Sequence, residues 1–201
     1  QRKAWGYRQD QLPTTHPIVA DMFDLDAVEV NFDGITYAKG ASALRQLVAW
    51  VGEDAFFAGI REYFKKHAWG NTELNDLLVE LEAASGRSLK DWTQRWLQTA
   101  GVNTLRPVLE IDGDSYKSIT ISQETPLVPA ESKELRPHRL AVGLYDISGD
   151  SLKLRKSVEL DVAGASTVVA ELAGEKVADL LLINDRDLSY AKLRFDERSI
   201  S

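Results

Sequence analysis

The sequence predicts an α+β protein of two domains, with an N-terminal α-helical bundle followed by a β-sandwich of seven strands or so. Apolar residues recur at helical spacing over residues 43–99, whereas after Gly101 they alternate with polar residues. The boundary is expected near Gly101–Arg106, so the two domains should comprise residues 1–102 and 103–201. A chain of 201 residues is long enough for two small domains.

Four helices are expected in the first domain, because four segments place their apolar side chains on one face. The four faces consist of Leu44, Leu47, Val48 and Val51; Phe56, Phe57, Ile60, Tyr63 and Phe64; Leu74, Leu77, Leu78 and Leu81; and Leu89, Trp92, Trp96 and Leu97. A glycine follows each segment as a helix end: Gly52, Gly70, Gly86 and Gly101. Asn71 is expected to cap the third helix. The faces should form the core, and the short loops predict antiparallel neighbours.

Seven strands are expected in the second domain, because turn sequences separate segments of period two. The segments are 105–112, 116–124, 138–147, 151–160, 166–172, 178–185 and 190–196. Asp112 and Asp114 flank Gly113 and are expected to be turn residues. The polar, proline-containing segment Thr125–Pro137 should be a surface loop.

Composition excludes several classes of protein. The net charge of −7 argues against a general nucleic-acid binder, and no apolar run reaches the roughly 20 residues of a membrane helix. The chain has no cysteine, which excludes disulfides and thiolate ligands and suits a cytoplasmic protein. The chain opens without a methionine, and its segment Arg2–Tyr7 reads like the end of a helix. We therefore expect an excised piece of a longer protein.

The three histidines do not predict a metal site by themselves. His16, His67 and His138 lie far apart, and no H-E-x-x-H spacing is present. His16 precedes Pro17, where we expect it to bond the backbone. His67 should cap a helix end, where a cation is favourable, and His138 should be exposed.

The other polar residues also do not form a complete catalytic or metal-binding motif. Asp21, Asp24 and Asp26 form an acidic cluster, but it lacks the spacing and glycine of an EF-hand, so solvated or helix-capping carboxylates are expected. No P-loop, G-x-G-x-x-G or G-x-S-x-G motif is present. Tyr37, in the segment "ITYAKG", is open to two interpretations. It is either a core aromatic with its hydroxyl bonded to backbone or a residue whose hydroxyl faces a reaction centre.

A set of motifs lies between His16 and Gly101. They are His16-Pro17; Phe32-Asp33, Ile35, Tyr37 and Lys39-Gly40; Gly52, Phe56 and Tyr63; Asp76-Leu77; and Trp92, Trp96, Leu97 and Gly101. In these motifs the sequence resembles the aminopeptidase N family of zinc metallopeptidases (gluzincins). The stretches "SITISQETP" and "LAVGLYD" resemble the β-rich third domain of that family, and "YRQDQLPTTHPI" resembles its actinobacterial branch.

The resemblance implies that residues 1–102 are the helical C-terminal portion of a thermolysin-like metallopeptidase domain. The family's H-E-x-x-H motif, its later zinc-binding glutamate and its G-x-M-E-N loop do not stand in this chain. The resemblance places them before Gln1, and a large helical domain after Ser201. Zinc is thus implied for the parent enzyme and not for this chain. The implied partners are peptide substrates and these missing domains, and the chain alone should be inactive.

By the same resemblance, Tyr37 is the one catalytic-type residue of this chain, with its hydroxyl bonded to the oxyanion of the tetrahedral intermediate. Phe32 is implied to edge the pocket for the substrate's first side chain. Lys39 and Gly40 should serve the turn. Two alternatives stay open: a non-catalytic scaffold of the same fold, and an epoxide-hydrolysing relative. An excised piece should expose apolar surface on the Arg2–Tyr7 side and around Tyr37.

Overall fold

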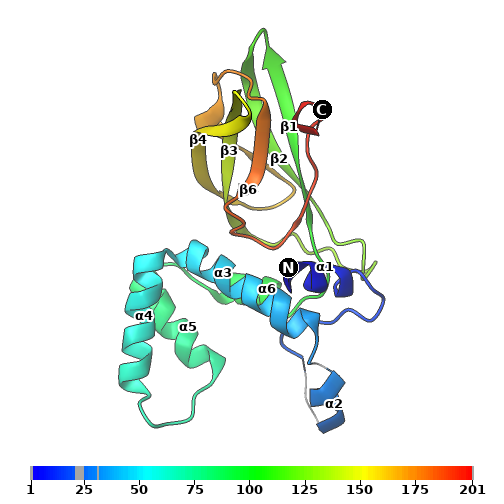
Figure 1. Ribbon diagram of the computed structural model, residues 1–201. Helices are drawn as coiled ribbons and strands as arrows, with labels where there is room; N and C mark the ends of the chain where they lie inside the picture. Colours follow the sequence, from blue (N-terminus) through cyan, green and yellow to red (C-terminus); the bar gives the residue numbers. More distant parts are fainter. Residues whose placement is uncertain (1, 21–24, 31, 201) are drawn as a thin grey trace.

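The computed structural model describes residues 2–20, 25–30 and 32–200. It has a helical part and, joined to it, two β-sheets that stand above the helices in Figure 1. The predicted α+β fold class is therefore confirmed. The change of period after Gly101 coincides with the change from helix to strand, because β1 begins at Thr104.

The helical part contains the four expected helices, at nearly the expected places. In chain order its elements are α1 (Arg2–Gln9), α2 (Leu25–Val30), a π-helix η1 (Ile35–Lys39), α3 (Gly40–Val51), α4 (Glu53–Lys66), α5 (Leu74–Ser85) and α6 (Lys90–Leu97). The helices α4 and α5 lie side by side (Figure 1). The core of this part comes mainly from α3, α5 and the region of α6, where the buried residues are Ala43, Leu47, Val51, Leu81, Leu89, Trp92 and Trp96. The predicted faces are therefore confirmed only in part, because Leu44, Phe57, Phe64 and Leu74 are exposed.

The cap of α5 differs from the prediction. Asn71 was expected to cap this helix, but the cap residue is Glu73. The Asp76 carboxylate accepts the backbone N–H of Glu73 at 2.9 Å, so an acidic residue inside the first turn satisfies the free donor. At the other end Gly86 adopts the left-handed conformation (φ 68°) that terminates helices, as predicted.

The sandwich consists of one sheet of four strands and one of three. The first sheet has the order β5-β2-β1-β7 and the second β4-β3-β6. The strands are β1 (Thr104–Asp112), β2 (Ser115–Glu124), β3 (His138–Ser148), β4 (Ser151–Val162), β5 (Ser166–Val168), β6 (Leu180–Asp185) and β7 (Lys192–Leu193). Neighbours are antiparallel except β1 and β7, which are parallel. The turn at Gly113 (φ 61°) joins β1 to β2, as predicted.

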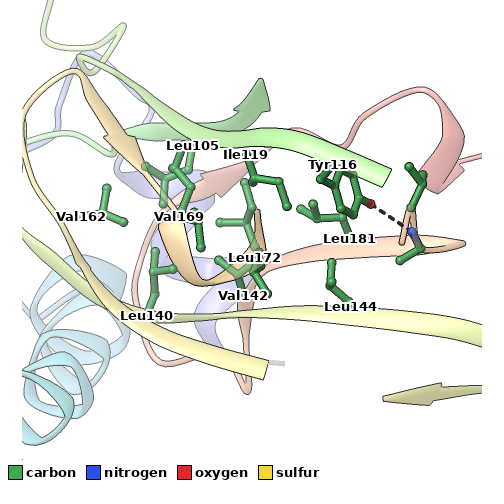
Figure 2. Close-up of a cluster of buried hydrophobic side chains, with 14 of the residues drawn as sticks. Leu105, Tyr116, Ile119, Leu140, Val142, Leu144, Val162, Val169, Leu172 and Leu181 are labelled. Atoms are coloured by element: carbon green, nitrogen blue, oxygen red, sulfur yellow. Dashed lines mark hydrogen bonds between the residues drawn. The ribbon is translucent and has the colours of Figure 1, made fainter. Parts of the chain in front are cut away.

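Alternate residues of both sheets meet in one core, shown in Figure 2. Its main members are Leu105, Tyr116, Ile119, Ile121, Leu140, Val142, Leu144, Leu181 and Ile183. The hydroxyl of Tyr116 accepts the backbone N–H of Ala178 at 3.2 Å, which satisfies the one polar atom this ring buries.

Two predicted strands are shorter than expected. Segment 166–172 is a strand only to Val168, and Ala170–Leu172 form a 3₁₀-helix. Val169 and Leu172 are three positions apart and both are buried. In a strand, two such side chains would point to opposite faces, whereas a 3₁₀ turn brings them to the same side, so both can enter the core. In segment 190–196 only Lys192–Leu193 are paired, since Tyr190 and its neighbour Ala191 are both buried and break the alternation.

The segment Thr125–Pro137 is not simply a surface loop. Its last part runs between the two halves of the molecule, where Arg136 is buried. The indole of Trp96 donates to the Pro137 carbonyl at 2.8 Å. This segment therefore connects α6 to the sandwich, a role that its polar composition concealed.

His138 is buried, which corrects the prediction that it is exposed. Its Nε2 lies 2.9 Å from Gln123 Oε1, and its Nδ1 lies 2.6 Å from the Ser189 hydroxyl. Gln123 donates its own NH₂ to the Gly164 carbonyl, so its oxygen faces the ring and Nε2 must carry the proton. Burial, together with the charge of Arg136, lowers the pKa of His138 to about 3.

His138 should therefore make the protein acid-sensitive. The unfolded chain takes up a proton as pH falls below about 6.5, whereas the folded chain does so only near pH 3, so stability is lost as pH falls through that window. We expect about 2 kcal/mol less free energy of unfolding at pH 5 than at pH 7 from this residue. Urea unfolding should show this loss in the wild type and a smaller one in His138→Gln. Equal losses in both proteins would contradict the burial of a neutral ring.

Candidate functional site

Tyr37 lies in the π-helix η1 with its side chain 53% exposed. The interpretation as a core aromatic is therefore wrong. Its ring lines a cavity of about 640 Å³, and among the described residues none forms a hydrogen bond with its hydroxyl. The other residues that line this cavity are Lys3, Trp5, Ala38, Ala41, Ser42, Arg45 and Asp187.

Tyr37 also lines a second cavity, of about 440 Å³, which is almost wholly apolar. It runs between α3, α5 and α6, and its lining includes Ile18, Leu44, Leu47, Leu74, Leu77 and Trp92. Tyr37 thus contributes to one cavity that has charged side chains in its lining and to one with hydrocarbon walls.

The N-terminal end of η1 is stabilised by Asp33. Its Oδ1 accepts the backbone N–H groups of Ile35 and Thr36 at 2.8 and 2.9 Å, and its Oδ2 lies 2.8 Å from His16 Nε2. The other ring nitrogen of His16 faces the Pro17 carbonyl at 2.7 Å, which confirms the expected backbone bond.

The C-terminal end of η1 carries Lys39, whose ammonium group is fully buried and lies 2.9 Å from Asp10 Oδ2. Burial lowers the pKa of Lys39 to about 8, the charge of Arg136 adds to the decrease, and Asp10 opposes it. The prediction that Lys39 serves the turn agrees with this position. Its partner could not be predicted from a local pattern, because Asp10 lies 29 positions earlier in the chain.

Phe32 lies beside Tyr37 and is 61% exposed. The two rings meet edge to face with centroids 5.7 Å apart. The described linings of the two cavities do not include Phe32. Trp5, Phe32, Tyr37 and Leu44 are all exposed, so apolar surface does occur on the Arg2–Tyr7 side and around Tyr37, as expected.

The described residues do not fit a zinc site. No group of three His, Asp or Glu side chains among them is arranged to hold a metal ion. His67 is the C-terminal cap residue of α4, as predicted, and its N–H donates to the Tyr63 carbonyl at 3.0 Å. Of the predicted acidic cluster, Asp26 lies in the first turn of α2, whereas Asp21 and Asp24 fall outside the described residues. Over the same described residues, no helix combines the length and apolar character that crossing a membrane requires.

Comparisons with known proteins agree with these motifs. Residues 2–96, which include Tyr37, match the peptidase family M1 domain. Over its whole length the chain is 58% identical to aminopeptidase N of Streptomyces lividans. Tricorn protease-interacting factor F2 of Thermoplasma volcanium is 40% identical over 58% of the chain, and glutamyl aminopeptidase of Bos taurus is 36% identical over 64%.

Residues 2–96 are therefore similar to the peptidase family M1 domain, and the resemblance of the chain to aminopeptidase N is confirmed. It covers 24% of the Streptomyces protein, and 14% and 13% of the other two relatives. These relatives are thus much longer than this chain, in which the sequence shows no H-E-x-x-H motif.

The exposure of Tyr37 can be tested on this chain by nitration. Tetranitromethane attacks the phenolate form, so Tyr37 should be nitrated well before Tyr116 and Tyr190, which are both 2% exposed. Burial also raises the pKa of Tyr116 and of Tyr190, which slows their reaction further. Mass spectrometry of tryptic peptides measures the order. Nitration of Tyr116 at the rate of Tyr37 would contradict the described exposure.

Proposed function

We propose that this chain is part of a zinc-dependent aminopeptidase that removes N-terminal residues from peptides, and that Tyr37 stabilises the oxyanion of its tetrahedral intermediate. The observation that carries the proposal is the phenol of Tyr37, which lines a cavity that has charged side chains in its lining and stands in a segment similar to the peptidase family M1 domain. Aminopeptidases stand among the relatives that match the chain, which supports the reaction class.

The chemistry of this step needs only a neutral donor in the right place. A phenol hydroxyl donates a hydrogen bond near neutral pH, and the carbonyl oxygen of a peptide gains negative charge as the tetrahedral intermediate forms. A donor aimed at that oxygen therefore stabilises the transition state more than the bound substrate. Phe32, in contact with the Tyr37 ring, would border the side chain of the substrate's first residue.

The proposal divides the chain into residues 1–102, the helical portion of a thermolysin-like catalytic domain, and residues 103–201, the β-sandwich domain. The described side chains do not fit zinc, so the ion and the general base would belong to polypeptide outside this chain. This chain alone would then hydrolyse no peptide. We also propose that the whole protein acts in the cytoplasm on peptide substrates.

The test is the Tyr37→Phe substitution in the full-length protein that contains this chain. Hydrolysis of aminoacyl-arylamides should be readily measured for the wild type. Loss of one oxyanion donor typically costs about 100- to 1000-fold in turnover, and we expect a fall in kcat of at least about tenfold with KM little changed. Steady-state kinetics of the two proteins give both constants.

The control is Tyr63→Phe, which removes the same hydroxyl group from a tyrosine away from the candidate site. Tyr63 lies on α4, and its hydroxyl is hydrogen-bonded to Thr72 at 2.6 Å. The kcat of this variant should equal that of the wild type. Equal turnover in Tyr37→Phe would remove Tyr37 from the mechanism. A full-length protein without any peptidase activity would instead favour the non-catalytic scaffold.

A further inference from the structure

The end of α1 reaches both ends of the π-helix that carries Tyr37. Gln9 and Asp10 are adjacent in sequence, and they bond to opposite ends of the segment from Asp33 to Lys39. α1 lies beside the start of α3 in Figure 1, where this segment is located. Both residues stand in the stretch "YRQDQLPTTHPI", to which the resemblance assigns no role.

Gln9 fixes the N-terminal end. Its amide nitrogen donates to Asp33 Oδ2 at 2.7 Å, and its amide oxygen accepts the backbone N–H of Gly34, also at 2.7 Å. One side chain therefore bonds both the carboxylate that caps η1 and the backbone just before it. Both halves of the amide are used, which sets its orientation.

Asp10 fixes the C-terminal end. Its side chain is fully buried, and its Oδ2 pairs with Lys39 at 2.9 Å. Its other oxygen accepts the Thr15 hydroxyl at 2.7 Å and the backbone N–H of Gly101 at 2.9 Å. A carboxylate with this many fixed donors has little freedom to move, so Lys39 is attached to a rigid point.

The contact between α1 and the turn is also sterically close. A Cβ atom on Gly6 would lie 3.2 Å from Ala38 Cβ, 3.2 Å from the Gly34 oxygen and 3.3 Å from the Lys39 nitrogen. The absent side chain lets the helix lie directly against the backbone of η1. The turn thus rests on α1 between its two anchors.

We infer that Gln9 and Asp10 are positioning residues, which fix the two ends of η1 so that the Tyr37 side chain keeps its place in the lining of the cavity that includes Lys3, Arg45 and Asp187. The kinetic part of this inference rests on the proposed function, because Gln9 and Asp10 can affect kcat only if the position of Tyr37 does. A π-helical turn is uncommon and is often found at functional sites. Here two neighbouring side chains keep it in place.

The first experiment measures the turn in this chain, without any assumption about activity. Gln9→Met removes both amide bonds at similar size, and Gln11→Met is the matched control, because Gln11 is exposed and bonds only the Tyr7 carbonyl. Hydrogen exchange of the backbone amides of residues 35–40 should become about tenfold faster or more in Gln9→Met and stay unchanged in Gln11→Met. Exchange in α5 should be the same in all three proteins. Unchanged exchange at residues 35–40 in Gln9→Met would overturn the inference.

The second experiment measures the kinetic consequence in the full-length protein. Gln9→Met should lower kcat by about tenfold while KM changes little, since a misplaced donor weakens only the transition-state interaction. In a Tyr37→Phe background the same substitution should cost no further turnover, because the hydroxyl it would misplace is gone. An equal loss in both backgrounds would mean that Gln9 acts without Tyr37, and the inference would be wrong.

Asp10 is tested by a paired substitution, because Lys39→Met alone would leave an uncompensated buried carboxylate. Asp10→Asn together with Lys39→Met removes the ion pair without leaving a lone charge. This double variant should repeat the pattern of Gln9→Met in both experiments. If Tyr37→Phe itself leaves kcat unchanged, the proposed role of Tyr37 fails, and the exchange experiment alone then decides whether Gln9 and Asp10 fix the turn.

Discussion

The ion pair of Lys39 and Asp10 is the constraint on which the rest of the structure depends, because it joins the candidate site to the place where the helical part meets the sandwich. Both side chains are fully buried, and a buried charge is tolerated only when it is paired and hydrogen-bonded. The pair meets this need through Gly101, whose N–H donates to Asp10 and whose carbonyl accepts from Lys39. Gly101 has a φ of 84°, and a Cβ there would lie 2.3 Å from the Val128 oxygen. The turn of Tyr37 and the start of the sandwich therefore share one fixed point.

The elements that could be predicted from the sequence are those in which apolar residues recur at regular spacing along a whole helix or strand. The faces of α3 to α6 and the alternation in β1 to β4 each recur over many residues, so a single exception does not hide them. The errors fall where one tertiary contact decides the outcome. His138 is buried because Gln123 and Ser189 supply partners from other segments. The predicted strand 166–172 ends at Val168 and continues as a 3₁₀-helix over Ala170–Leu172, because Val169 and Leu172 both enter the core.

The candidate site was predictable only in part, for a related reason. Tyr37 could be singled out because the motif around it is local, and the resemblance to a family carries its proposed role. The anchors could not be found in this way, since Gln9 and Asp10 lie more than twenty positions before the residues they bond. Nothing in the period or composition of α1 distinguishes these two side chains from solvated ones. Their partners appear only when the chain is folded, because long-range pairing leaves no mark on the local sequence.

Two buried cations, Lys39 and Arg136, lie near the Asp10 carboxylate, and backbone carbonyls help to compensate them. Arg136 lies close enough to lower the pKa of Lys39, and burial lowers its own pKa to about 10. Yet its guanidinium donates to the carbonyls of Arg95, Thr99 and Ala100. These carbonyls stand at the C-terminal end of α6, where the helix dipole is negative. These carbonyls therefore share the compensation of Arg136 with the negative charges of Asp10 and Glu134, both of which raise its pKa. Through Asp10, Arg136 links the end of α6 electrostatically to the ion pair that holds the turn of Tyr37.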